Sequence, residues 1–202
     1  MIGRKAVVFD WGGVLMRTTN YTYRHRWDLR LGLAEGEVEK IVHGIPEWLR
    51  AQACSMPLDD YWKRVGNLLG LPPDDLNQLR SDFYRGDTLN AELIPWIKHL
   101  RKRGVAIGLL SNNTLDLIEV IQKTQVISLL DAIVISAQIG VLKPSIEAYT
   151  AILTALNISA DHVLFVDDFA ENVDGARRAG ISAILFDPQI DIRIQAEQWL
   201  NQ

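Results

Sequence analysis

The chain has 202 residues, of which 48% are hydrophobic and 23% charged. These proportions are typical of a globular protein and exclude a disordered or fibrous chain. The formal net charge of −4 gives no electrostatic reason to expect nucleic acid or an anionic membrane as a partner, and the single cysteine, Cys54, excludes an intramolecular disulfide. Asp10 interrupts the N-terminal apolar run too early for a signal peptide or a membrane span, so we expect a cytoplasmic protein.

Five short apolar runs along the chain are predicted to form strands. Their nearly continuous hydrophobicity is typical of strands buried on both faces, as in a parallel sheet. They span residues 5–10, 105–111, 131–136, 162–168 and 182–186. Amphipathic helical patterns lie between them, at residues 89–104 and 144–157, and Pro144 suits the first position of the second helix. The alternation predicts an α/β fold with a Rossmann-like, doubly wound parallel sheet.

Residues 16–87 break this alternation, because they contain helical patterns and polar turns but no run that resembles a buried strand. We therefore expect a helical insert, residues 16–87, within a core made of residues 1–15 and 88–202. Tryptophans of the insert are expected to pack its interior. The charged stretch YRHRWDLR, residues 23–30, either faces a substrate or forms an exposed helix surface, and the second interpretation is favoured because charge runs are usually solvated.

Polar side chains gather where the predicted strands end. Ligands bind beyond the carboxyl ends of the strands in open parallel sheets, so residues from distant segments are expected to meet there. These residues are Asp10, Ser111, Asn112, Lys143, Asp167 and Asp168. Taken one at a time they also have structural explanations: a strand end with a tight turn, a helix cap, a solvated lysine and loop acids.

The charges of this group indicate what it binds. Carboxylates at close range repel, and one stays protonated unless positive charge lies between them. A divalent cation supplies that charge, and oxygen ligands without histidine or thiolate ligands favour Mg²⁺ over zinc. Lys143 directly precedes Pro144 and a predicted helix start, where the macrodipole disfavours a cation, so an anionic group is expected beside it.

Four sequence motifs carry a resemblance to a known family. The chain resembles the haloacid dehalogenase-like (HAD) hydrolase superfamily along its whole length, and the insert is similar to the small helical cap of such proteins. The motifs are FDWGGV with Asp10, LLSNN with Ser111, VLKPSIEAY with Lys143, and FVDDFAENVDGARRAG with Asp168. Within the superfamily, the chain resembles bacterial phosphatases of the type acting on α-D-glucose 1-phosphate and the phosphatase domain of epoxide hydrolases.

The resemblance implies a phosphatase for a small phosphorylated metabolite. It implies that Asp10 is the nucleophile and forms an aspartyl-phosphate, that Ser111 and Asn112 hold the phosphoryl oxygens, and that Lys143 neutralises charge.

The resemblance also implies a metal site. Mg²⁺ would be bound by Asp10, the Gly12 carbonyl and Asp168, with Asp167 and Asn172 supporting these ligands.

One position departs from the phosphatase pattern. Such enzymes carry a second aspartate two residues after the nucleophile as general acid and base, and here that position is Gly12. Proton transfer from a placed side chain is worth about 100- to 10,000-fold. We therefore expect slower turnover or a restriction to good leaving groups, with His25 the one histidine kept as a substitute donor. A metal-independent 2-haloacid dehalogenase and a non-catalytic phosphate-binding protein remain alternative functions.

Overall fold

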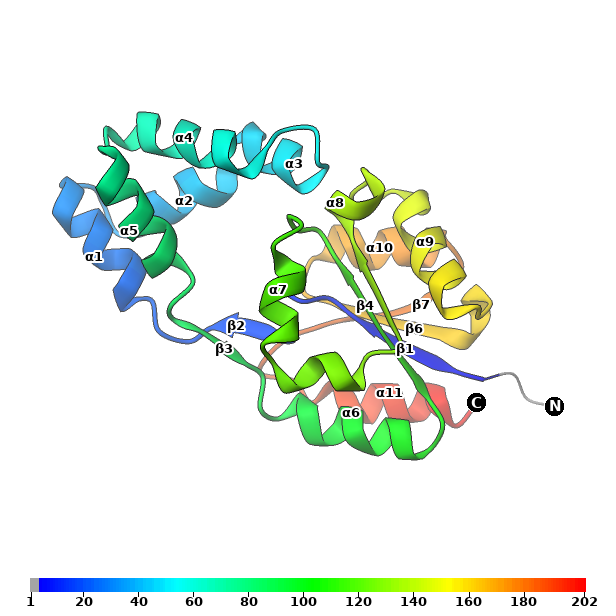
Figure 1. Ribbon diagram of the computed structural model, residues 1–202. Helices are drawn as coiled ribbons and strands as arrows, with labels where there is room; N and C mark the ends of the chain where they lie inside the picture. Colours follow the sequence, from blue (N-terminus) through cyan, green and yellow to red (C-terminus); the bar gives the residue numbers. More distant parts are fainter. Residues whose placement is uncertain (1–3) are drawn as a thin grey trace.

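The computed structural model describes residues 4–202 and has at its centre a five-stranded sheet in the order β5-β4-β1-β6-β7 (Figure 1). All neighbouring strands pair in parallel. The strands are β1 (Ala6–Phe9), β4 (Ala106–Ser111), β5 (Ala132–Ile135), β6 (Val163–Asp167) and β7 (Ser182–Leu185). Each predicted apolar run contains one of them, so the predicted parallel α/β fold is confirmed.

Helices cover both faces of this sheet. Side chains of β1 alternate between the faces, with Val7 and Phe9 in one hydrophobic cluster and Ala6 and Val8 in another. The first cluster includes residues of α6 (Leu93–Lys102), α7 (Leu117–Gln122) and α11 (Ile192–Leu200), and the second includes residues of α9 (Ile146–Leu156) and α10 (Ala170–Arg178). No helix within residues 4–202 is both long and apolar enough to cross a membrane.

The start of α9 differs from the prediction. The helix begins at Ile146, so Pro144 lies before it rather than at its first position. The reason is a pair of hydrogen bonds that hold the preceding residue in a turn: Asn112 Oδ1 accepts from the Lys143 N–H at 2.8 Å, and Asn112 Nδ2 donates to the Lys143 carbonyl at 2.9 Å. The Asn112 side chain thereby fixes the main chain of Lys143, which lies before the start of the helix.

The insert consists of five helices carried on a two-stranded antiparallel ribbon. The ribbon strands, β2 (Met16–Thr18) and β3 (Asp87–Leu89), are short and half-exposed, which is why no apolar run revealed them. The helices are α1 (Thr22–Leu31), α2 (Glu37–Gly44), α3 (Pro46–Gln52), α4 (Leu58–Leu69) and α5 (Pro73–Phe83). Their shared interior contains Trp27 and Trp62, both buried as expected.

Charged residues of α1 are buried, so the expected exposed surface for residues 23–30 is wrong for part of that stretch. The Arg24 side chain is only 3% exposed. Its guanidinium donates to the Phe83 carbonyl at 2.9 Å and to Thr18 Oγ1 at 2.8 Å, and pairs with Glu39 at 2.6 Å and Asp87 at 3.2 Å. Arg24 is buried because these partners satisfy its donors, and it joins both ribbon strands to three helices.

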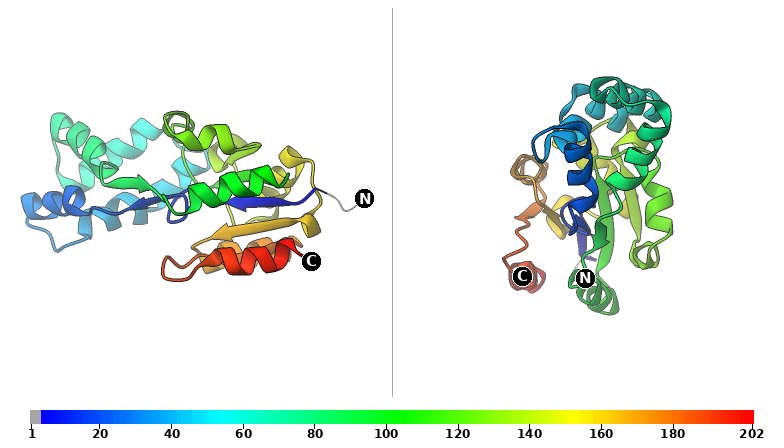
Figure 2. Two further views of the ribbon diagram at one scale, coloured as in Figure 1. Left: turned by 90° about the horizontal axis from the view of Figure 1, so that it is seen from below. Right: turned by 90° about the vertical axis from the view of Figure 1, so that its left-hand side faces the viewer.

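The insert lies beyond the carboxyl ends of the sheet strands, as the two views of Figure 2 and the ribbon in Figure 1 show. Helix α3 approaches the short helix α8 (Ser136–Ile139), which directly follows β5. The polar residues that follow the strands therefore face the insert.

Candidate active site

A buried cluster of acids around one lysine lies at the carboxyl edge of the sheet. Lys143 Nζ is 3.0 Å from Asp10 Oδ1 and 2.6 Å from Asp167 Oδ2. Carboxylate oxygens of Asp10, Asp167 and Asp168 lie within 4.8 Å of one another. Asp10 is 7% exposed, Lys143 4% and Asp167 0%. Residues distant in the sequence thus meet where the strand pattern placed them.

Main-chain and side-chain donors fix the two acids that contact the lysine. Asp10 follows β1, its N–H bonds to the Val166 carbonyl at 2.9 Å, and its Oδ1 accepts the Trp11 N–H at 2.7 Å. Asp167 ends β6 and accepts the Phe169 N–H at 2.8 Å and the Asn172 side-chain amide at 3.1 Å. Both carboxylates are therefore oriented before any ligand binds.

Burial and the charges of neighbouring side chains together shift the pKa values of the cluster. It raises the pKa of Asp10 to about 7, with Asp167 and Asp168 acting in the same direction and Lys143 opposing them. The pKa of Asp168 is raised by burial and by Asp167. For Lys143, burial alone would lower the pKa, but the neighbouring Asp10 and Asp167 outweigh it and leave the pKa raised. Three acids thus share one ammonium, an imbalance that favours an additional cation.

The donor set fits a hard divalent cation. Asp168 Oδ1 is buried and has no hydrogen-bond partner among residues 4–202, which is an expensive state for a carboxylate oxygen unless something binds it. Gly13 leaves room for this side chain, because a Cβ at that position would lie 2.0 Å from Asp168 Oδ2. Gly13 also has a φ of 76°, which favours glycine. Oxygen ligands of this kind suit Mg²⁺.

The remaining predicted site residues adjoin the cluster in different ways. Ser111 is 2% exposed and ends β4, which pairs with β1. The side chain of Asn112 is occupied by the main chain of Lys143, so it positions the lysine. Gly12 is exposed, and a Cβ there would meet nothing within 4 Å. His25 lies on α1, at the outer end of the insert, and pairs with Glu35 at 3.4 Å, so the structure does not place it in the cluster (Figure 1).

Two residues that the sequence did not single out reach this region. Gln52, from the insert, donates to the Asn112 carbonyl at 2.8 Å, and its own carbonyl accepts from Ser136 Oγ at 2.7 Å. These two residues are Gln52 and Ser136. Neither belongs to a recognisable local motif, because Gln52 is 60 positions from Asn112 and 84 positions from Ser136 in the chain. No signal in the sequence alone points to them.

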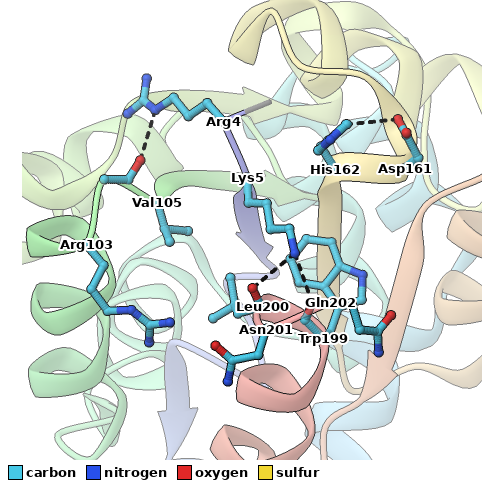
Figure 3. Close-up of a pocket in the computed structure, with 11 residues that line it drawn as sticks. Arg4, Lys5, Arg103, Val105, Asp161, His162, Trp199, Leu200, Asn201 and Gln202 are labelled. Atoms are coloured by element: carbon cyan, nitrogen blue, oxygen red, sulfur yellow. Dashed lines mark hydrogen bonds and ion pairs between the residues drawn. The ribbon is translucent and has the colours of Figure 1, made fainter. Parts of the chain in front are cut away.

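A separate cavity of about 650 Å³ lies at the opposite end of the sheet, where the strands begin (Figure 3). Its cationic side chains already have partners. Lys5 donates to the Trp199 and Leu200 carbonyls, and Arg103 pairs with Glu197 at 2.6 Å. The residues that line the cavity include no member of the acidic cluster, and the candidate active site remains the cluster at the carboxyl edge.

The parallel core, the inserted helices and the buried acid–lysine cluster together define a Rossmann-like enzyme with a capped acidic site. A family model for haloacid dehalogenase-like hydrolases matches residues 4–180. The chain belongs to this family of hydrolases.

Relatives and solved structures agree with this assignment. A phosphatase of Mycobacterium tuberculosis is 32% identical over 194 residues, covering 90% of this chain and 87% of its own. A sesquiterpene phosphatase of Aspergillus oryzae is 27% identical, with 88% and 87% covered. A HAD family enzyme of Bacteroides thetaiotaomicron, solved with magnesium and inorganic phosphate, has the same fold, with a TM-score of 0.77, 18% identity and 94% and 97% covered.

Proposed function

We propose that this protein is a magnesium-dependent phosphatase of small phosphorylated metabolites, with sugar 1-phosphates as the first candidates. The observation that carries the proposal is the buried contact of Lys143 with Asp10 and Asp167, beside an Asp168 oxygen that has no hydrogen-bond partner among residues 4–202. The two phosphatases among its relatives support the reaction class.

In the proposed reaction, Asp10 attacks the phosphorus atom of the substrate. The new bond joins a carboxylate oxygen to phosphorus, the bond from phosphorus to the leaving oxygen breaks, and an aspartyl-phosphate forms. Water then hydrolyses it and releases inorganic phosphate. Lys143 offsets the negative charge of Asp10 and of the transferring group, and Ser111, at the end of β4, holds the phosphoryl oxygens. The side chain of Asn112, expected from the sequence to share this role, instead bonds to the main chain of Lys143 and keeps the lysine in place.

Asp10, Asp168 and the Gly12 carbonyl would hold the Mg²⁺ ion. When bound, it neutralises negative charge on the phosphoryl oxygens. Asp167 has a different role, because its oxygens already accept from Lys143, Asn172 and the Phe169 N–H. It keeps the lysine beside Asp10.

The leaving group must accept a proton unless it is stable as an anion. Position 12 carries no side chain that could donate one, and His25 lies outside the cluster. We therefore propose that the enzyme acts on phosphates whose leaving groups need little protonation, which are anomeric, acyl or aryl phosphates.

A substrate panel tests the proposal. Sugar 1-phosphates, sugar 6-phosphates, acetyl phosphate and p-nitrophenyl phosphate are incubated with purified protein in Mg²⁺ or in chelator. Phosphate release is expected from the activated substrates in Mg²⁺ only. Asp10→Asn should abolish it, whereas Asp174→Asn, on the exposed side of α10, should retain it.

Two other outcomes would replace the proposal. Chelator-insensitive halide release from 2-haloacids would identify a dehalogenase. A metal-independent reaction would leave the buried Asp168 Oδ1 without a ligand or a hydrogen-bond partner in the described part of the chain. Binding of inorganic phosphate without turnover of any substrate would identify a non-catalytic binding protein, consistent with glycine at position 12.

A further inference from the structure

Gln52 connects the insert to the core at the end opposite the ribbon. It is the last residue of α3 and is 7% exposed. Its side-chain Nε2 donates to the Asn112 carbonyl at 2.8 Å, and its main-chain carbonyl accepts from Ser136 Oγ at 2.7 Å. Within residues 4–202, these are the only hydrogen bonds between helices α1–α5 and the core. Within these residues, one residue therefore makes all the hydrogen bonds that join α3 to the core.

Hydrogen bonds connect Gln52 to the catalytic lysine through Asn112. Asn112, whose carbonyl accepts from Gln52, holds the N–H and the carbonyl of Lys143 with its side chain. Ser136 also accepts the N–H of Asn113 at 2.9 Å, so both of Gln52's partners fix the segment after β4. Lys143 in turn extends its ammonium to Asp10 and Asp167.

We propose that Gln52 is a positioning residue that couples closure of the insert to the placement of Lys143. With α3 docked, the Asn112 carbonyl is held from the insert side while the Asn112 side chain holds the lysine backbone. Without this contact, the hydrogen bond from the α3 side chain to the core is lost, the docked position of α3 is held less firmly, and the segment after β4 loses one of its restraints. The inference rests on the proposed phosphatase function only where it concerns turnover.

The coupling predicts a specific kinetic effect. Gln52→Met keeps the length of the side chain but removes the donor, and Gln52→Glu places a carboxylate against the Asn112 carbonyl. Loss of a buried hydrogen bond corresponds to about a 5-fold change, and repulsion adds to it. With p-nitrophenyl phosphate in saturating Mg²⁺, we expect kcat to fall about 5-fold in Gln52→Met and further in Gln52→Glu, with KM changing less than 2-fold.

Gln78→Met is the matched control. Gln78 also lies in the insert and uses its side chain in a hydrogen bond, but to Asp82 at 3.1 Å within the insert rather than to the core. A merely structural effect would lower the folded fraction of both variants alike. The coupling requires that kcat per folded molecule falls for the Gln52 variants and is unchanged for Gln78→Met.

Amide hydrogen exchange gives a readout that does not depend on activity. In metal-free protein, the Gln52 variants should exchange faster in peptides covering residues 112–114 and 143–149, with peptides from α4 unchanged. If wild-type protein releases no phosphate, the proposed function fails and this exchange pattern alone decides the role of Gln52. Unchanged exchange in both peptides, or unchanged kcat in both Gln52 variants of an active enzyme, overturns the inference.

Discussion

Lys143 Nζ lies 3.0 Å from Asp10 Oδ1 in a region from which water is almost excluded, since the two residues are 4% and 7% exposed. An ion pair in such a place is expensive to break from one side, because the remaining charge stays buried without a partner. The pair therefore affects both the stability of the fold and the chemistry proposed for it.

Replacing the lysine should damage stability and activity together. Lys143→Met removes the one ammonium that contacts Asp10 and Asp167 within the described chain. We expect the free energy of unfolding to fall by about 3 to 5 kcal/mol and phosphate release to be lost. Urea unfolding and a p-nitrophenyl phosphate assay measure these effects. Lys123→Met, at an exposed position, is the control, and equal stability of the two variants would argue against a buried ion pair.

Adding the missing acid at position 12 should widen the substrate range. A Cβ there meets nothing within 4 Å, and Gly12 is not among the glycines with positive φ, so Gly12→Asp should fold. Turnover of alkyl phosphates, which need a protonated leaving group, should rise by up to about 100- to 10,000-fold, with little change for p-nitrophenyl phosphate. Gly12→Asn supplies similar bulk without the acid. An equal rise in both variants would contradict a role in proton transfer.

Position 13 should tolerate no side chain. In Gly13→Ala the new Cβ would lie 2.0 Å from Asp168 Oδ2 and must displace that carboxylate. Binding of a metal at 100 times its Kd stabilises a folded protein by about 2.7 kcal/mol, so Mg²⁺ should raise the Tm of the wild-type protein. We expect this Mg²⁺-dependent rise in Tm to be absent from Gly13→Ala.

Gly104→Ala separates this clash from backbone strain. Gly104 also has a positive φ, at 82°, but its added Cβ meets nothing within 4 Å. The variant should lose some stability while keeping the Mg²⁺-dependent rise in Tm. If Gly13→Ala keeps that rise as well, Asp168 does not bind the metal.

Acid should destabilise the insert through His43. This side chain packs against Phe83 and Trp48, and burial, with Arg24 nearby, lowers its pKa from 6.5 to about 4. The unfolded chain therefore takes up a proton at a higher pH than the folded protein does. Stability is complete above about pH 6.5 and falls as the pH drops towards 4, by up to about 3 kcal/mol for this group.

Replacing His43 by a residue that does not titrate tests whether its protonation causes the loss of stability in acid. His43→Gln should weaken the loss of stability between pH 6.5 and 4, measured by urea unfolding at several pH values. Asn67→Gln, at an exposed position of α4 that carries no titratable group, is the control and should leave the pH dependence unchanged. Identical pH profiles for wild type and His43→Gln would assign the effect to other groups.

The core was predictable because its signals are local. A strand buried on both faces must be continuously apolar, so β1, β4 and β6 could be recognised from their own residues. The parallel arrangement then places Asp10 and Asp167 at one edge, and the spacing of the four motifs adds Lys143. These parts of the candidate site follow from the pattern of the chain.

The parts that could not be predicted depend on contacts between distant segments. Burial of Arg24 requires acceptors from the ribbon and from two other helices, none of which a charge run reveals. Gln52 is an ordinary helix residue until α3 meets Asn112. The start of α9 moved past Pro144 for the same reason, because a side chain 31 positions earlier holds the turn.

The burial of Arg24 has a consequence for how the molecule opens. Because this guanidinium bonds to Thr18 of β2, Asp87 of β3 and the end of α5, the ribbon and the helices would swing as a single rigid lever. The pivot then falls below the ribbon, where the chain passes between core and insert at residues 10–16 and 89–93. Each opening or closing movement would rotate the backbone at Gly12 and Gly13. Admission of substrate and assembly of the catalytic centre would therefore depend on the same hinge.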